Sequence, residues 1–243
     1  MIMKLQKLYR YVRQAADEYN LIEDGDKIAV ALSGGKDSIT LLKALKSLQY
    51  FYPKKFDLIA ISVNPGFEFF DAEFLKKTCE EVGVPLFVEE YNISKIVFED
   101  RKEKNPCSLC ANLRRGILNT AAKREGCNKI ALGHNLDDVL ETFLMNLFFA
   151  GNISTFSPVS FMDRSGITLI RPLIYVPEKE TKRFVKKSGT AVMSKVCPMD
   201  GNSTREYVKQ LIVTLSLKNK HVKANIMGAI KRNNINGWKD TTK

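Results

Sequence analysis

The stretch Lys27-Ile28-Ala29-Val30-Ala31-Leu32-Ser33-Gly34-Gly35-Lys36-Asp37-Ser38, residues 27–38, decides the fold. Its first half is short and largely apolar, as expected of a strand buried on both faces of a parallel sheet. Its second half is a glycine-rich loop, and a helical pattern follows over residues 39–48. Glycines let backbone N–H groups turn toward an anion, the helix start adds unpaired N–H groups, and Lys36 adds a full charge. The stretch therefore predicts a phosphate site.

The hexapeptide Ser33–Ser38 differs from the better-known phosphate loops. A Walker loop needs glycine at position 30, where valine stands, and serine or threonine at position 37, where aspartate stands. It is not a dinucleotide fingerprint either. The hexapeptide resembles that of the pyrophosphate-loop (PP-loop) ATPases, which cleave ATP between the α and β phosphates and adenylate a substrate oxygen. An ordinary glycine-rich turn is the alternative, and the strand–loop–helix context argues against it.

The flanking sequence repeats the strand–helix alternation. Strands are predicted at Leu58–Val63, Leu86–Val88 and Lys129–Leu132, and helices at Ala72–Val82, Ala111–Arg124 and Asp137–Phe149. Such alternation is typical of an α/β fold with a doubly wound parallel sheet. Beyond Gly151 the pattern loosens, with a strand expected at residues 168–170 and a helix at 178–187.

Three segments are expected from this pattern. Residues 1–26 form an N-terminal helical extension, because apolar residues recur at near-helical spacing over residues 1–20. Residues 27–200 form the PP-loop nucleotide-binding α/β domain, which carries a cysteine pair. Residues 201–243 form a basic, helical C-terminal extension.

Composition limits the class of protein. Of 243 residues, 44% are apolar and 27% are charged, which is an ordinary globular mixture and excludes wholesale disorder. No apolar run approaches the roughly 20 residues of a membrane span, so we expect neither signal peptide nor membrane anchor, and a cytoplasmic protein. Five irregularly spaced cysteines indicate thiols or metal ligands rather than a disulfide framework.

The formal charge of +11 is unevenly distributed. Residues 203–243 hold nine Lys/Arg and two acidic residues, and so contribute +7. A basic face attracts polyanions through Coulomb steering and counterion release, which favours RNA as a partner. A solvated basic helix is the alternative, since charge alone fixes no partner.

A second polar element, Gly133-His134-Asn135-Leu136-Asp137-Asp138, follows another predicted strand. Strand ends are where such sheets bind ligands. Asp137 and Asp138 are either ligands of Mg²⁺ bound to ATP oxygens or charges that favour a helix N-terminus. A lone histidine makes a poor metal site, so we interpret His134 as a structural or substrate-orienting residue.

The pair Cys107-Ser108-Leu109-Cys110 begins a predicted helix, whose N-terminus favours thiolate. A thioredoxin-like redox pair would follow the first strand, and a zinc site would need a second pair. Cys197, in a polar loop, is the remaining candidate ligand, since Cys79 and Cys127 lie in or beside predicted packed elements. Three thiolates are an incomplete set for a cluster normally held by four, which leaves one iron open to a sulfide or persulfide.

Several separated blocks together resemble the tRNA 2-thiocytidine synthetase (TtcA) family of PP-loop enzymes, over roughly residues 5–232. The blocks are Asn20–Asp26 leading into Ser33–Ser38, Cys107–Cys110 with Leu113–Leu118, Ile130–His134 with Asp137-Asp138, and Ile170-Arg171-Pro172-Leu173.

The resemblance implies an adenine nucleotide alpha hydrolase-like fold and an ATP-dependent tRNA sulfurtransferase. The family adenylates O2 of cytidine 32, and sulfur then displaces AMP. The implied cofactors are ATP, Mg²⁺ and a four-iron, four-sulfur cluster held by Cys107, Cys110 and Cys197. The implied nucleotide-binding residues are Ser33, Gly34, Gly35, Lys36, Asp37, Ser38, Gly133 and Asp138, and the candidate catalytic residues are Lys36, Asp37, Asp138 and Arg114. The expected partners are tRNA, a cysteine desulfurase or another sulfur donor, and a second copy of the chain.

Two departures from the family pattern leave the assignment open. Asn135 stands where the family often has a second histidine, and no second cysteine pair lies near Cys197. Asn135–Asp138 also resembles relatives that thiolate uridines, although those carry zinc-binding cysteine pairs near both termini. A cluster-free PP-loop ligase of the lysidine synthetase type and a non-catalytic protein that binds zinc and RNA are the remaining hypotheses.

Overall fold

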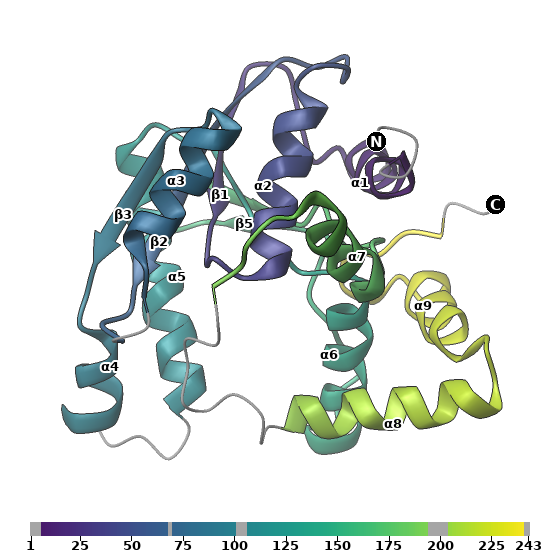
Figure 1. Cartoon of the computed structure of the whole chain (residues 1–243). Helices are drawn as coiled ribbons and strands as arrows, with labels where there is room; N and C mark the ends of the chain where they lie inside the picture. Colours follow the sequence, from purple (N-terminus) through teal and green to yellow (C-terminus); the bar gives the residue numbers. More distant parts are fainter. Residues whose placement is uncertain (1–5, 68–69, 101–105, 194–203, 241–243) are drawn as a thin grey trace.

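A six-stranded sheet lies at the centre of the chain, whose computed structural model describes residues 6–67, 70–100, 106–193 and 204–240. The strands lie in the order β3-β2-β1-β4-β6-β5 (Figure 1). Their bounds are β1 Asp26–Ala31, β2 Phe56–Asn64, β3 Leu86–Glu90, β4 Lys129–Ala131, β5 Val159–Met162 and β6 Ile167–Ile170. The first strand is the most deeply placed, as its apolar run predicts: Ile28, Ala29 and Val30 are fully buried.

Five of the strands run parallel, which confirms the predicted doubly wound sheet. β1 pairs with β2 on one side and with β4 on the other. From β1 the chain therefore adds β2 and β3 on one side of the sheet and then β4 and β6 on the other. The edge strand β5 differs, because it pairs antiparallel with β6 through a short hairpin. The sequence did not predict β5: none of its residues is fully buried and Phe161 is 62% exposed, so no apolar pattern marks it.

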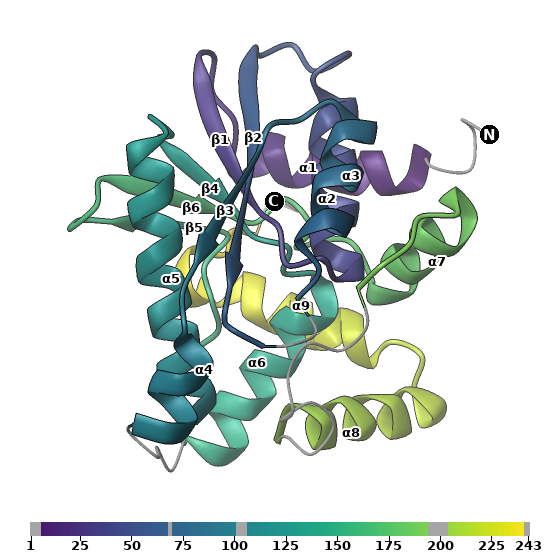
Figure 2. The same cartoon turned by 60° about the vertical axis from the view of Figure 1, so that its left-hand side comes forward.

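Helices cover both faces of the sheet. α2 and α3 pack on one face and α5 on the other, as an edge-on view shows (Figure 2). The described helices are α1 Gln6–Glu18, α2 Lys36–Leu48, α3 Ala72–Val82, α4 Ile93–Lys95, the π-helical turn η2 Ile96–Asp100, α5 Pro106–Arg124, α6 Leu136–Phe149, α7 Glu178–Ser188, α8 Thr204–Lys218, α9 Val222–Arg232 and the 3₁₀ turn η3 Ile235–Gly237.

Local signals in the sequence set several helix ends. α3 has the predicted bounds because the Asp71 side chain accepts a hydrogen bond from Phe74 N–H at its start, and Gly83 adopts a left-handed φ of 69° after its end. α6 begins at a capping box in which Asn135 and Asp138 satisfy each other's N–H groups. α5 begins at Pro106, earlier than the predicted Ala111, since proline suits a first helical turn. The cysteine pair therefore lies within α5.

Both terminal segments share one apolar core with the central sheet. Val12 of α1 and Val208 of α8 are fully buried in the same cluster as β1 and α2. Trp238 is also fully buried there, and its Nε1 donates a hydrogen bond to the carbonyl of Phe156 at 3.0 Å. The C-terminal helices are therefore fixed against α6 and the sheet.

None of the helices in the described ranges has the length and apolar character needed to cross a membrane.

Candidate nucleotide site and thiol pair

The loop Ser33–Ser38 connects β1 to α2 and is held by its own hydroxyl groups. Ser38 Oγ donates to the Gly35 carbonyl at 2.9 Å and accepts from Ser33 N at 3.2 Å. Gly34 has a φ of 78°, in the left-handed region that favours glycine. The hydroxyl bonds and the glycine thus fix a tight turn at the end of the buried strand.

The N-terminus of α2 is open toward a ligand. Gly35 occupies its N-cap position and provides no side-chain hydrogen bond, so the first N–H groups of the helix lack a capping partner. Gly133, at the end of β4, packs on this turn so closely that a Cβ there would lie 3.2 Å from Ser38 N. Glycine at position 133 therefore lets the two strand ends approach, and the open N-terminus suits an anion.

A cavity of about 360 Å³ adjoins the loop. It lies at the carboxyl ends of β1, β2 and β4, where doubly wound sheets bind ligands. Its lining comes from the loop and strand ends and from α5: Ala31, Leu32, Ser33, Asp37, Ser38, Ile61, Val63, Ala111, Arg114, Arg115, Leu118, Leu132, Gly133, His134 and Leu169. The apolar lining residues suit a purine or pyrimidine ring, and the loop and the two arginines suit phosphate.

Lys36 lies in a network of ion pairs. Its Nζ is 2.6 Å from Asp37 Oδ2 and 3.2 Å from Glu178 Oε1, at the start of α7. Burial opposes the charged form of Lys36, but the two carboxylates outweigh it and raise the pKa. Burial likewise opposes ionisation of Glu178, and hydrogen bonds from lysines lower its pKa to about 2. Lysine and glutamate are therefore both charged at neutral pH.

Asp138, which is partly buried, and Glu141, which is buried, are neighbouring acidic residues of α6. Arg205 of α8 approaches both, with its Nη1 3.7 Å from Asp138 Oδ1 and 3.3 Å from Glu141 Oε2. Burial raises the pKa of Asp138, and burial together with the nearby Asp138 charge raises the pKa of Glu141 to about 7. Asp137 lies apart from them: it accepts a hydrogen bond from Glu178 N and pairs with Lys223.

His134 lies between the cavity and an aromatic ring. Its imidazole packs on Phe156 with ring centroids 4.8 Å apart, and its buried Nδ1 has no hydrogen-bond partner among the described residues. Burial lowers the pKa of His134 to about 3, with further contributions from Arg171 and other arginines. The ring is therefore neutral at physiological pH, which is consistent with a structural or substrate-orienting role.

The cysteine pair lies in the first turn of α5. Cys107 is exposed and Cys110 is partly buried, and both precede Ala111 and Arg114 of the cavity wall. Cys79 and Cys127 are buried, and burial raises the pKa of each thiol to about 11. Cys197, the third predicted ligand, lies outside the described residues.

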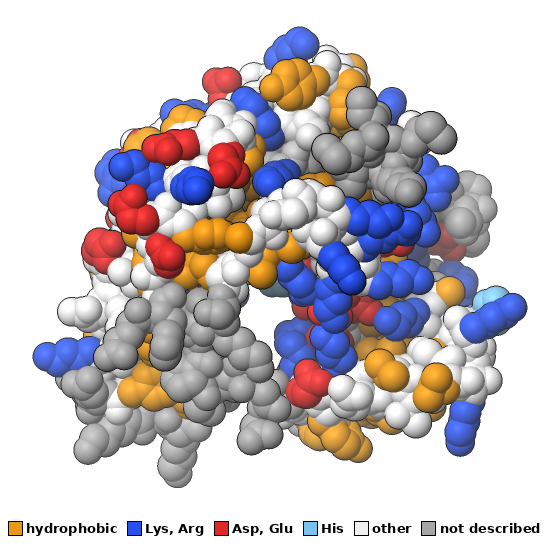
Figure 3. All heavy atoms as spheres, viewed as in Figure 1, with side chains coloured by type: hydrophobic (Ala, Val, Ile, Leu, Met, Phe, Trp, Pro, Cys, Tyr) orange, Lys and Arg blue, Asp and Glu red, His pale blue; other side chains and the backbone are white. Residues whose placement is uncertain are grey.

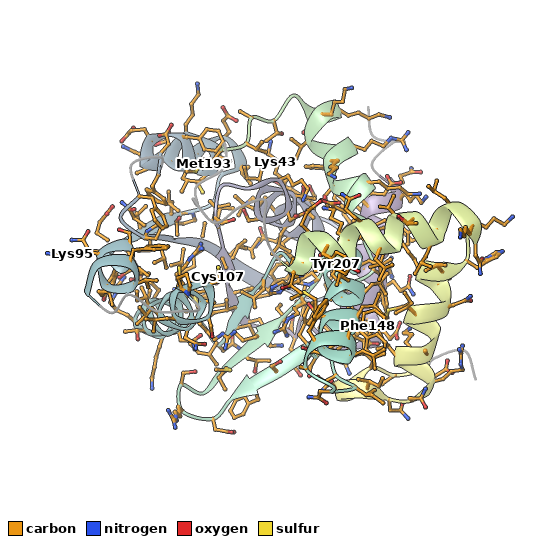
Figure 4. The ribbon with its side chains drawn as sticks, turned by 90° about the horizontal axis from the view of Figure 1, so that it is seen from below. Lys43, Lys95, Cys107, Phe148, Met193 and Tyr207 are labelled. Atoms are coloured by element: carbon orange, nitrogen blue, oxygen red, sulfur yellow. The ribbon has the colours of Figure 1, made fainter. Side chains whose placement is uncertain are left out.

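Met193, the last described residue before Cys197, contacts the loop. Met193 N donates a hydrogen bond to the Gly34 carbonyl at 2.9 Å, so this residue packs directly on the phosphate turn. In the view from below, Met193 and Cys107 both lie to the left of Tyr207 and Phe148 (Figure 4).

The structure brings five of the sequence-predicted residues together. Ser33, Asp37, Ser38, Gly133 and Arg114 line one cavity. Asp138 is not among the lining residues and instead caps α6 and contacts Arg205. Glu178, Arg205 and Lys209 were missed, because no motif marks them and only the folding of α7 and α8 against the loop places them there. In the sequence, only the basic character of residues 203–243 pointed to Arg205 and Lys209.

Comparisons with known proteins agree with this geometry. Residues 4–215 match the family model described as PP-loop domain. The chain is 39% identical to a tRNA-cytidine(32) 2-sulfurtransferase of Geobacter metallireducens, over 93% of this chain and 90% of that protein. It is 38% identical to the enzyme of the same name from Geobacter sulfurreducens, over 94% and 90%.

A solved structure is also similar: the U34-tRNA thiolase NcsA from Methanococcus maripaludis with its 4Fe-4S cluster, at 27% identity and a TM-score of 0.78, over 95% of this chain and 78% of that one. A phosphate loop on a doubly wound sheet, matched over most of the chain by these relatives, places the chain in the PP-loop family and, within it, among the tRNA-cytidine(32) 2-sulfurtransferases.

Proposed function

We propose that this chain is an ATP-dependent tRNA sulfurtransferase that adenylates O2 of cytidine 32 and replaces that oxygen with sulfur delivered through an iron–sulfur cluster. One observation carries the proposal. The phosphate loop and the helix that carries the cysteine pair both line a single cavity. A base held there lies within reach of both ATP and a sulfur carrier.

The phosphate loop and its neighbours serve the first step. The base oxygen attacks the α-phosphorus of ATP, and pyrophosphate leaves. The open N-terminus of α2 and Lys36 stabilise the charge that grows on pyrophosphate. Arg114, which lines the same cavity, would add a cation beside these phosphates. Adenylation converts a poor leaving oxygen into AMP, which departs when sulfur attacks C2.

The carboxylates near the loop fit Mg²⁺. Asp37 Oδ2 binds Lys36, whereas Asp37 Oδ1 is buried and has no hydrogen-bond partner among the described residues. An unpartnered carboxylate oxygen beside a phosphate site suits Mg²⁺, which prefers one or two carboxylates plus phosphate oxygens and water. We assign Asp37 and Asp138 as the residues that would hold it.

The thiols fit an iron–sulfur cluster. Cys107 and Cys110 are one helical turn apart at a helix N-terminus, which favours the thiolate form that iron binds. Cys197 would be the third ligand, as the family resemblance implies. When bound, a cluster held by three cysteines supplies an iron with an open position for sulfur.

The C-terminal helices are proposed to contact the tRNA. Exposed aromatic rings from α6 and α8 lie together, with Phe149 and Tyr207 ring centroids 6.2 Å apart and both residues more than half exposed. Phe148 lies next to Tyr207 in the view from below (Figure 4). Aromatic rings beside basic side chains bind unpaired bases by stacking while the cations bind phosphate. The anticodon loop offers both groups.

Three further parts of the proposal rest on the family resemblance and on chemistry. Each turnover consumes one sulfur atom, so a cysteine desulfurase or another donor must resupply it. A homodimer is expected, which light scattering of the purified protein tests. Because its substrate is tRNA, we place the enzyme in the cytoplasm.

Mass spectrometry of tRNA nucleosides tests the function. A deletion strain should lose 2-thiocytidine, and a plasmid with the wild-type gene should restore it whereas Lys36→Ala should not. Loss of a thiouridine instead would redirect the proposal to the uridine thiolases. An unchanged nucleoside profile would refute it.

A further inference from the structure

Glu178, at the start of α7, connects the phosphate loop to helix α8. Its Oε1 is 3.2 Å from Lys36 Nζ of the loop, and its Oε2 is 3.1 Å from Lys209 Nζ of α8. Lys182, one turn along α7, is also 3.1 Å from Oε2. In the space-filling view, Lys and Arg side chains with acidic ones between them gather between α7 and α8 (Figure 3).

The backbone of Glu178 is fixed as well. Its N–H donates to Asp137 Oδ2 at 2.6 Å, and Asp137 in turn pairs with Lys223 of α9. The side chain of Glu178 is only 16% exposed, against 57% for Lys182 and 33% for Lys209. The backbone contact holds the carboxylate in position, and the surrounding lysines keep it charged although it is shielded from water.

The contact between Glu178 and Lys36 limits how the lysine can bind a phosphate. An ammonium group has three N–H donors. In Lys36, Asp37 and Glu178 accept two of them, which leaves one for a phosphate oxygen. A long lysine side chain otherwise loses rotamer entropy when it binds. Two fixed carboxylates remove much of that freedom before ATP arrives.

We propose that Glu178 is a positioning residue for Lys36, and that Lys209 of α8 holds Glu178 in place. Helix α8 would then form part of the ATP site. The proposal rests on the proposed function, since it takes the loop to bind the phosphates of ATP. It adds that α8 has a second role besides contacting RNA: through Glu178 it positions Lys36, the lysine that would bind pyrophosphate.

A second contact of α8 supports this arrangement. Arg205, one turn before Lys209, reaches the partly buried Asp138 and the buried Glu141 on α6. The apolar side of α8 is fixed by Val208 and Ile212, which are buried in the main core. The helix therefore directs Arg205 and Lys209 toward the acidic groups around the loop.

Binding of a non-hydrolysable ATP analogue with Mg²⁺, measured by calorimetry on the full chain without RNA, tests the proposal. Glu178→Gln keeps the shape of the side chain and removes its charge, and should weaken binding roughly tenfold, as expected for loss of a charge-assisted hydrogen bond. Lys209→Gln should weaken binding about two- to fourfold, because this lysine is one-third exposed and acts through Glu178. Glu180→Gln, on the same helix but paired with Lys7 and Arg183, is the matched control and should bind as the wild type does.

Non-additivity separates positioning from general electrostatics. The double variant Glu178→Gln/Lys209→Gln should bind no more weakly than Glu178→Gln alone, because Lys209 has nothing left to hold. In a Lys36→Gln background, Glu178→Gln should have no further effect. Urea unfolding of each variant checks that the fold is retained.

These measurements distinguish a failure of the proposed function from a failure of the positioning role of Glu178. If the wild-type chain binds no ATP analogue, the proposed function fails and this inference fails with it. If the wild type binds and Glu178→Gln binds equally well, only the positioning role is refuted. Fully additive effects of the Glu178 and Lys209 variants would show that α8 acts on the nucleotide by another route.

Discussion

Replacing Gly34 with alanine tests the close packing of the phosphate loop. Alanine at a φ of 78° is strained, at about 1–2 kcal/mol for a left-handed residue. Its Cβ would also lie 2.2 Å from Met193 Sδ and 2.7 Å from Met193 Cγ, so the methionine side chain must move. Overpacking of this kind costs about 1–3 kcal/mol. Gly34→Ala should therefore lower the free energy of unfolding by about 2–5 kcal/mol.

Gly35 provides the matched control. Its φ is −76°, and a Cβ there would meet nothing closer than Ser33 Oγ at 3.6 Å. Gly35→Ala should cost about 1 kcal/mol or less, the amount typical of losing glycine at a helix N-cap. Urea unfolding followed by circular dichroism, with linear extrapolation to water, measures both variants.

A double-mutant cycle isolates the contact with Met193. Met193→Ala removes the Sδ and Cγ atoms that would collide with the new methyl group, and leaves only the backbone strain. The double variant Gly34→Ala/Met193→Ala should therefore be more stable than the two single effects predict, by about 1–2 kcal/mol. Effects that add to within about 0.5 kcal/mol would refute the packing of Met193 on the loop. Equal losses for the Gly34 and Gly35 variants would refute the backbone argument.

Three further outcomes follow from the site. Cys107→Ser should abolish the brown colour and the bound iron of anaerobically purified protein. Cys79→Ser, which changes a buried thiol, should retain both. Equal iron content in the two variants would contradict the ligand assignment. Burial raises the pKa of Glu141 from 4.5 to about 7, so the folded chain holds a proton that the unfolded chain releases, and stability falls as pH rises between those values. Glu141→Gln should remove that part of the slope in urea unfolding at several pH values, and parallel curves would contradict the shift. Because burial lowers the pKa of His134 from 6.5 to about 3, its ring should show no NMR titration from pH 5 to 8, and a midpoint near 6.5 would contradict the buried neutral imidazole.

Features with a local cause were predictable from the sequence. The helix over residues 72–82 has its predicted bounds, because an aspartate starts it and a glycine ends it. The phosphate loop follows a buried strand and opens a helix, as the glycine-rich hexapeptide requires. The cysteine pair was correctly expected at a helix start, but the helix was predicted from Ala111 and begins at Pro106.

Features that depend on distant contacts were not predictable. The hairpin strand β5 gains its place from pairing with β6, and its exposed residues carry no apolar alternation. Glu178 looks like an ordinary acidic residue at a helix start. Its contacts with Lys36 and Lys209 join three elements that lie far apart along the chain.

The sequence by itself determined a doubly wound sheet, a glycine-rich loop between a buried strand and a helix, and a thiol pair at a helix start. Those features follow from apolar periodicity, glycine conformation and helix capping, which act over a few residues. Only the tertiary structure decided which cations and carboxylates surround that loop, that Met193 packs on Gly34, and that α8 folds back beside the ATP site. Long-range ion pairs form because apolar packing of α7 and α8 brings the charges together, and no local pattern in the sequence records that packing.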